Sequence, residues 1–317
     1  MNVKFYLRQP LFAVALVSWM LVAVAAEQNV GIGVIEQQLD CDSETTCEVS
    51  KREATLFRPL FQFQDGKWRR HYLADQSAEN SSKSDTVIWK VFQENKYERD
   101  LVTTGALSTK WYGAAGAQLM RELPAFNWNV KKKMIGWVPY AWPRIAISGS
   151  ESGKLLSTRV VQPSDSRVWQ AGVWWQKEFA NSKLRCSKEL SAGFSPVRLR
   201  ITDFKVEPYI VVSENKSIFR VIPRESVAKK CDVPHEEDSL SDQWYEVVGT
   251  NAPKSIPIAK QARSNGFRVD TQFLLAGDFV GDNTNSVVFR VSGYNEDGYV
   301  LYDLKSERMT TFVHGYH

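Results

Sequence analysis

Short apolar runs alternate with polar turns along most of the chain, a pattern typical of β-strands rather than helices. The strand-like runs come in pairs, each pair separated by a turn rich in Gly, Asn, Asp or Ser. Such pairs predict β-hairpins. We expect five of them: 56–63 with 67–73, 87–92 with 97–102, 144–147 with 155–161, 209–212 with 218–222, and 287–291 with 299–302.

Helical periodicity is weak throughout. Residues 114–122 form the best helix candidate, because Pro124 would end a short helix there. Residues 27–51 are polar and acidic with few periodic apolar positions, so we expect an irregular lead-in. The sequence therefore predicts an all-β protein with a single β-rich domain over residues 52–317.

The hairpins resemble one another in turn chemistry, which indicates a repeated unit. Repeated hairpins favour a β-propeller-like assembly of about five hairpin units. A β-sandwich or barrel stays open as the alternative, since its strands also alternate with polar turns.

The first residues have the pattern of a signal peptide. Lys4 and Arg8 precede an apolar run over 11–24, and small residues end at Ala26. We expect cleavage near Ala26, and a secreted or periplasmic mature protein. An uncleaved anchor is the alternative, but the apolar run of about 14 residues is shorter than the roughly 20 that cross a bilayer. No later stretch is long enough, so we expect no membrane span after cleavage.

The composition is that of an ordinary globular protein, with 43% hydrophobic and 24% charged residues. It excludes collagen-like and broadly disordered chains. The formal net charge is +4 from 40 basic and 36 acidic residues; without Lys4 and Arg8 it falls to about +2. With no basic excess across the domain, we expect no nucleic-acid partner.

Four cysteines are present, and an exported protein with an even number of them is expected to form two disulfides. Three pairings are open. The local one joins neighbours in sequence and needs the least distant contact. The spacing is not CxxC, which argues against zinc or thiol redox chemistry. The residues concerned are Cys41, Cys47, Cys186 and Cys231.

One acidic loop near the C-terminus carries recognisable chemistry. A strand-like run ends in Gly277-Asp278-Phe279-Val280-Gly281-Asp282, and a second apolar run follows. Over residues 273–303 the chain resembles the FG-GAP or VCBS repeat, whose usual loop reads GDFNGDG with a later Asp. The resemblance implies a propeller of the integrin type and a loop that holds calcium.

This loop departs from the repeat at three positions. Val280 stands where the repeat has Asn, Asn283 where it has Gly, and Ser286 where it has Asp. A weak calcium site is one interpretation. The other is that the two carboxylates accept hydrogen bonds from loop amides and hold the turn without metal. The candidate ligands are Asp278, Asp282, the main-chain carbonyl of Thr284 and the Ser286 hydroxyl.

Catalytic motifs are missing from the sequence. The four histidines, at 71, 235, 314 and 317, have no nucleophile or metal spacing. Glycosidases need only two acids close in space, so acids near strand ends are candidates, although we interpret them as turn formers and solvated charges. These acids are Asp203, Glu207, Asp278, Asp282 and Asp297.

Tryptophans are frequent in the middle third of the chain. Trp174 and Trp175 are adjacent on a predicted strand, so their rings face opposite sides. If one side is solvent, one ring forms an aromatic platform for a ligand such as a glycan; the alternative is core packing.

Together these features favour an exported, non-enzymatic binding or scaffold protein that holds a protein or glycan partner through loops. One alternative is a secreted hydrolase acting on polysaccharide, with carboxylates assembled across loops. Another is a structural or assembly factor of the cell envelope.

Overall fold

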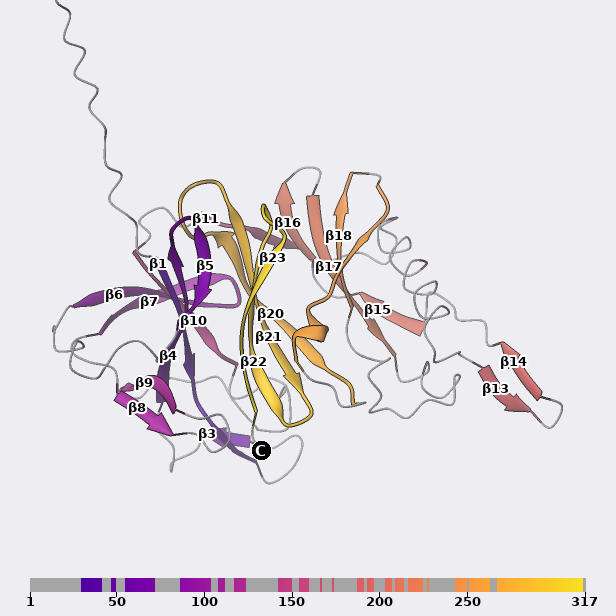
Figure 1. The fold of residues 1–317 in the computed structure, drawn as a ribbon, viewed down its shortest axis with the longest axis horizontal. Coiled ribbons are helices and arrows are strands. Elements are labelled where there is room, and N and C mark those ends of the chain that lie inside the picture. Colours follow the sequence, from indigo (N-terminus) through magenta and orange to yellow (C-terminus); the bar gives the residue numbers. More distant parts are fainter. Residues whose placement is uncertain are drawn as a thin grey trace, which may run out of the picture.

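The protein is built from three large antiparallel β-sheets in this computed structural model (Figure 1). This confirms the all-β class. None of the three sheets closes on itself. The structure describes residues 30–41, 47–49, 55–71, 86–103, 108–111, 117–123, 142–149, 154–159, 166, 173, 187–190, 193–196, 203–206, 209–213, 216–224, 227, 243–249, 251–262 and 267–315.

The first sheet, here called the N-terminal sheet, has the strand order β7-β6-β10-β1-β4-β9-β8, and β5 pairs with β4. Its strands are β1 (Val30–Glu36), β4 (Thr55–Gln64), β5 (Lys67–Arg70), β6 (Val87–Gln93), β7 (Lys96–Thr103), β8 (Ser108–Trp111), β9 (Ala117–Leu123) and β10 (Arg144–Ser148).

The second sheet, the central sheet, has the order β11-β20-β21-β22-β23. Its strands are β11 (Lys154–Leu155), β20 (Asp270–Asp278), β21 (Asn285–Gly293), β22 (Glu296–Asp303) and β23 (Arg308–Gly315). The last four strands follow one another in sequence and in space, so they form a four-stranded meander.

The third sheet has the order β12-β16-β17-β18-β19, and β15 pairs with β17. Its strands are β12 (Ser157–Arg159), β15 (Phe204–Val206), β16 (Tyr209–Ser213), β17 (Lys216–Pro223), β18 (Gln243–Val248) and β19 (Lys254–Ile256). The remaining elements are two strand pairs, β2 (Leu39–Cys41) with β3 (Cys47–Val49) and β13 (Ser187–Leu190) with β14 (Gly193–Pro196), and a 3-10 turn, η5 (Ala259–Gln261).

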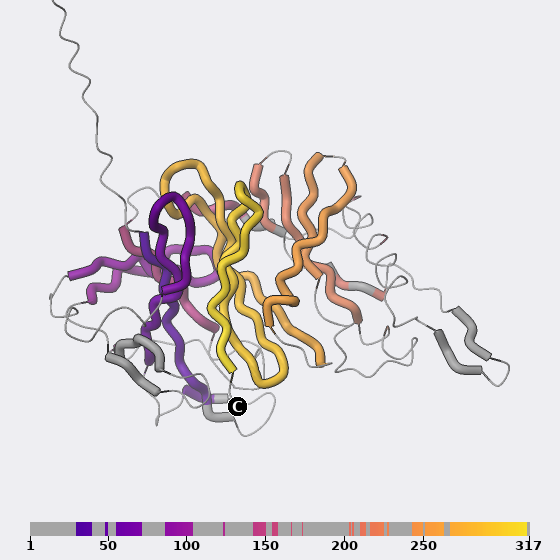
Figure 2. Tube along the Cα trace, in the orientation of Figure 1, coloured from indigo at the N-terminus to yellow at the C-terminus, as the bar shows by residue number. Residues whose placement is uncertain are grey.

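The central sheet is buried on both faces. Figure 2 shows its yellow strands between the indigo strands of the N-terminal sheet and the orange strands of the third sheet. On one face Val288 and Leu301 share a core with Ile32 of β1. On the other face Phe289 packs against Trp244 of β18, with ring centroids 4.7 Å apart. Double burial explains why β21 and β22 have apolar residues on both faces.

Four of the five predicted hairpins are confirmed as β4–β5, β6–β7, β16–β17 and β21–β22. The third prediction is wrong. β10 is buried throughout and pairs with β1 on one side and β6 on the other, so neither edge is left for a hairpin partner. The two strands that follow β10 pair with strands much later in the sequence: β11 with β20, and β12 with β16.

The predicted irregular lead-in is wrong for residues 30–36, because they form β1, an interior strand of the N-terminal sheet. Two glycines obscure its apolar run in the sequence. One of them, Gly33, lets β4 come close: a Cβ there would lie 2.4 Å from the Phe57 ring. The helix candidate at 114–122 is also wrong for residues 117–122, which belong to strand β9; pairing with β4 and β8 overrides their helical propensity.

The strand pair β2–β3 bears on the cysteines. Its backbone register sets Cys41 directly opposite Cys47, as the local pairing requires, and the disulfides themselves stay a prediction. The predicted signal peptide (1–26), Cys186, Cys231, Trp174 and Trp175 lie outside the described residues. Within the described part of the chain, no helix has the length and apolar character needed to cross a membrane.

We predict that Gly298→Ala strongly destabilises the central sheet. A Cβ at this position would lie 2.3 Å from the Phe312 carbonyl oxygen and 2.6 Å from the Val313 Cα, both backbone atoms of the adjacent strand β23. The loss in free energy of unfolding should be about 3 kcal/mol, as for severe overpacking. Urea denaturation measures it.

Gly66→Ala is the control. Gly66 has φ +71° but no atom within 4 Å of a new Cβ, so the cost should be only the backbone strain of about 1 kcal/mol. Equal losses in the two variants would contradict the close approach of β22 and β23.

Candidate functional site

At one end of the interface between the N-terminal and central sheets, three connections surround a pocket of about 350 Å³. They are the β4–β5 turn, the acidic loop 279–284 between β20 and β21, and the β22–β23 turn. The lining combines aromatic rings, hydroxyls and charges of both signs: Phe63, Gly66, Lys67, Trp68, Asp282, Thr284, Asp303, Lys305, Ser306, Arg308, Met309 and Thr310.

The β4–β5 turn supplies the aromatic side of the pocket. Its two central residues, Asp65 and Gly66, both have positive φ, which is the geometry that an Asp-Gly hairpin turn favours. The turn sets Phe63 opposite Trp68, with ring centroids 5.3 Å apart in an edge-to-face contact. Trp68 is buried and also meets Phe279 of the acidic loop edge-on. The aromatic side is therefore fixed by the core beneath it.

The acidic loop is held by its own carboxylates. Asp278 accepts the Gly281 amide on Oδ1 at 2.7 Å and the Asn283 amide on Oδ2 at 2.8 Å. Asp282 accepts the Thr284 amide on Oδ1 at 2.8 Å. Asn283 has φ 62°, a left-handed conformation that Asn tolerates better than most residues other than Gly.

The carboxylates of this loop serve the turn itself, and the calcium site stays a prediction. Both oxygens of Asp278 are engaged by amides, and Ser286 lies inside strand β21, opposite Gly277. Calcium prefers six to eight convergent oxygens, with several carboxylates among them. Within the described ranges, no three His, Cys, Asp or Glu side chains gather closely enough to hold a metal ion. The observed hydrogen bonds are those expected when Asp278 and Asp282 hold the turn.

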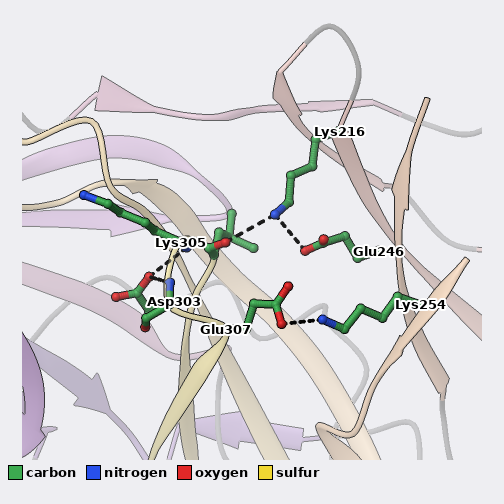
Figure 3. Close-up of polar contacts among 8 residues, drawn as sticks. Lys216, Glu246, Lys254, Asp303, Lys305 and Glu307 are labelled. Atoms are coloured by element: carbon green, nitrogen blue, oxygen red, sulfur yellow. Dashed lines mark hydrogen bonds and ion pairs between the residues drawn. The ribbon is translucent and has the colours of Figure 1, made fainter. Parts of the chain in front are cut away.

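The β22–β23 turn connects the pocket to the third sheet (Figure 3). Asp303 Oδ1 accepts the amides of Lys305 at 2.8 Å and Ser306 at 3.0 Å, which closes the turn. Lys216 of β17 donates to the Leu304 carbonyl at 3.2 Å and pairs with Glu246 at 3.0 Å. Lys254 pairs with Glu307.

Lys305 lies on the other side of this turn. Its side chain extends away from the contacts with the third sheet in Figure 3. The turn therefore binds the third sheet through one side and contributes Lys305 to the pocket lining with the other.

A buried ionic cluster lies elsewhere in the same interface. Glu36 of β1 pairs with Arg58 of β4 at 3.0 Å and accepts the hydroxyl of Tyr299 from β22. Arg290 pairs with Asp297 at 3.2 Å. All five side chains are buried. Both ion pairs lie within one sheet, and the hydrogen bond from Tyr299 to Glu36 crosses between the sheets. Displacing the sheets would break that bond to a buried charge, so the cluster favours one arrangement of the two sheets.

The cluster shifts the pKa of its members. Burial alone would raise the pKa of Glu36, but Arg58, the Tyr299 hydroxyl and Arg290 outweigh burial and lower it. Burial, together with the Glu36 charge, raises the pKa of Tyr299. Burial, with a smaller contribution from the Arg58 charge, lowers the pKa of His314 to about 3, so this imidazole is neutral at pH 7.

The other sequence candidates lie apart from the pocket. Asp203 is buried beside β15, and Asp297 belongs to the ionic cluster. His71 follows β5, where burial lowers its pKa. Glu207, His235 and His317 lie outside the described residues. Of the five candidate acids, Asp282 lines the pocket, and Asp303, which sequence reasoning missed, lines it too. In the sequence Asp303 directly follows an apolar run, and this position could have identified it as a candidate residue at a strand end.

Comparison of the chain with protein-family models, with curated proteins and with solved structures found no match. The likeness of residues 273–303 to FG-GAP or VCBS repeats therefore rests on the residues themselves and stays a prediction.

We predict that Asp278→Ala costs about 2 to 3 kcal/mol in free energy of unfolding, because two loop amides lose their acceptor. Asp282→Ala should cost about 1 kcal/mol, since Asp282 is exposed and holds a single amide. Thermal unfolding with excess calcium and with chelator measures both. Equal melting temperatures in the two solutions are expected; a wild-type rise with calcium that Asp278→Ala abolishes would contradict the metal-free loop.

We predict an acid-sensitive stability that His314 helps to set. In the unfolded chain this imidazole binds a proton near pH 6.5, and in the folded protein only at about pH 3. The unfolded state therefore binds more protons between these values, so stability is full above pH 6.5 and falls as pH decreases. The slope from His314 should be about 1 kcal/mol per pH unit well below pH 6.5.

Denaturation at pH 7 and pH 5 measures this slope, and His314→Gln should reduce it. The slope of His71→Gln is measured for comparison, because burial lowers the pKa of His71 as well. A slope unchanged in His314→Gln would show that the imidazole is not buried in its neutral form.

Proposed function

We propose that this protein is an exported, non-enzymatic carbohydrate-binding protein whose ligand lies in the pocket between the N-terminal and central sheets. The leader-like pattern over residues 1–26 supports export. The observation that carries the proposal is the pocket itself, which combines aromatic rings with hydroxyl and carboxylate groups.

The chemistry of the lining suits a sugar. Sugar rings pack their C–H face on aromatic side chains, and Phe63 is the half-buried ring of the lining. Sugar hydroxyls both donate and accept, so they match Asp282 and Asp303 as acceptors and the hydroxyls of Ser306 and Thr310 as either. The volume of about 350 Å³ lies at the small end of ligand pockets and suits one or two sugar units.

Hydrogen bonds hold the loops around the pocket in one arrangement, which favours ligand binding. Asp278 and Asp282 fix the acidic loop, Asp303 closes the β22–β23 turn, and Lys216 ties that turn to the third sheet. Preorganised groups lose little entropy on binding. Loops on a fixed scaffold are the usual location for such sites.

We further propose that the three sheets are propeller-like units stacked face to face. The four-stranded meander β20–β23 and its packing on both faces support this arrangement. The repeat-like loop at 277–282 lies between the first two strands of that meander, so each such unit would present a loop at the same end.

A polysaccharide hydrolase is the second candidate, because two carboxylates, Asp282 and Asp303, line one pocket. Each already accepts amides of its own turn through Oδ1, which favours binding over turnover. Release of reducing sugar from a panel of polysaccharides, lost in Asp303→Asn, would establish the hydrolase.

We predict that Phe63→Ala weakens glycan binding about tenfold, because stacking on an aromatic ring contributes roughly 1 kcal/mol or more. A glycan array identifies the ligand, and calorimetry with the best ligand measures affinity. Tyr97→Ala is the matched control: it removes an exposed ring on β7, which does not line the pocket. Equal loss in both variants, or no glycan bound by the folded wild type, would refute the proposal.

A further inference from the structure

The pocket lining carries three cations that form no ion pair within the described residues. Lys67 begins β5, Lys305 lies in the β22–β23 turn and Arg308 begins β23. Within the described part of the chain, their side chains make no hydrogen bond or ion pair. Nearby cations differ: Arg69 pairs with Asp65, Lys216 with Glu246 and Lys254 with Glu307. The pocket lining therefore contains three cations that have no partner in the described part of the chain.

The two acids of the lining offset only part of this positive charge, and each is also hydrogen-bonded within its own turn. Asp303 Oδ1 is shared by two turn amides, and Asp282 Oδ1 holds the Thr284 amide. Arg308 lies directly opposite Asp303 in the β22–β23 register, yet the two side chains form no ion pair. Three cations against two engaged carboxylates leave the pocket with a net positive charge.

From this arrangement we propose that the pocket selects an acidic saccharide, one whose ring carries a carboxylate, phosphate or sulfate group. This inference rests on the proposed carbohydrate-binding function and adds its ligand class. The anionic group lies among Lys67, Lys305 and Arg308, where charge-assisted hydrogen bonds are about twice as strong as neutral ones. The ring hydroxyls donate to the remaining lone pairs of Asp282 and Asp303.

A bare anion suits this pocket less well than an acidic sugar. It would use the cations but leave Phe63 without a contact and would meet the two carboxylates as like charges. A neutral sugar would leave the three cations without a partner. Only a ligand with an anionic end and a hydroxyl-bearing ring uses the whole lining.

Calorimetry with four probes tests the proposal: glucuronic acid, glucose 6-phosphate, glucose and inorganic phosphate, each at low and at physiological salt. We expect at least one acidic sugar to bind about tenfold or more tightly than glucose and than inorganic phosphate, and to weaken as salt rises. Comparing glucuronic acid with glucose 6-phosphate distinguishes a carboxylate from a phosphate ligand.

Other outcomes separate the two proposals. If glucose binds as tightly as the acidic sugars, the carbohydrate function stands and the acidic preference is overturned. If inorganic phosphate binds as tightly as glucose 6-phosphate, the ring contributes nothing and the site is an anion site only. If no probe binds and the glycan array is also blank, both proposals fail.

A matched pair of charge reversals completes the test. Lys305→Glu should weaken the acidic sugar about tenfold or more and leave glucose unchanged. Lys260→Glu, in the exposed turn η5, changes the net charge equally but does not line the pocket, and should leave both affinities unchanged. Both side chains are exposed, so the two variants should fold, and melting temperatures check this. Equal effects in the two variants would overturn the assignment of Lys305.

Discussion

The burial of the central sheet on both faces is the constraint on which the rest of the structure depends. Its strands supply apolar side chains to one core shared with the N-terminal sheet and to a second core shared with the third sheet. Each fully buried large side chain contributes about 1.5 to 3 kcal/mol. Because both cores share these strands, the position of the central sheet determines where its connecting loops lie.

The interface between the N-terminal and central sheets uses charge in two opposite ways. In the buried cluster, Glu36 pairs with Arg58 within the N-terminal sheet and accepts the hydroxyl of Tyr299 from the central sheet, so its charge joins the two sheets. In the pocket, Lys305 and Arg308 are exposed and unpaired within the described part of the chain, so they remain available to a ligand. The two sheets also share an apolar core that includes Ile32, Val288 and Leu301.

The sequence predicted local features well. The Asp65-Gly66 turn and the Asn95 turn each predicted a hairpin, because these residues adopt the positive φ that such turns require. The sequence did not predict pairings between strands that lie far apart along the chain. β1 was missed because Gly31 and Gly33 interrupt its apolar run. These glycines leave room for the side chains of Trp89 from β6 and Phe57 from β4. The residues of β9 favour helix locally, but pairing with β4 decides their structure.

The candidate site was predictable only in part. Asp278 and Asp282 were identified from their loop, and the structure gives them the turn-forming geometry. Lys67 and Arg308 could not be associated with that loop, since they come from different strands and meet it only through sheet packing. Glu36 and Tyr299, 263 positions apart, illustrate the same limit for the ionic cluster.

Native-state hydrogen exchange tests the central claim most directly. If the central sheet is buried on both faces, the amides of β21 and β22 should be the slowest to exchange, opening only with global unfolding. The exposed edge strand β7 should exchange orders of magnitude faster. Exchange in β21 and β22 as fast as in β7 would contradict the three-sheet packing and, with it, the placement of the pocket.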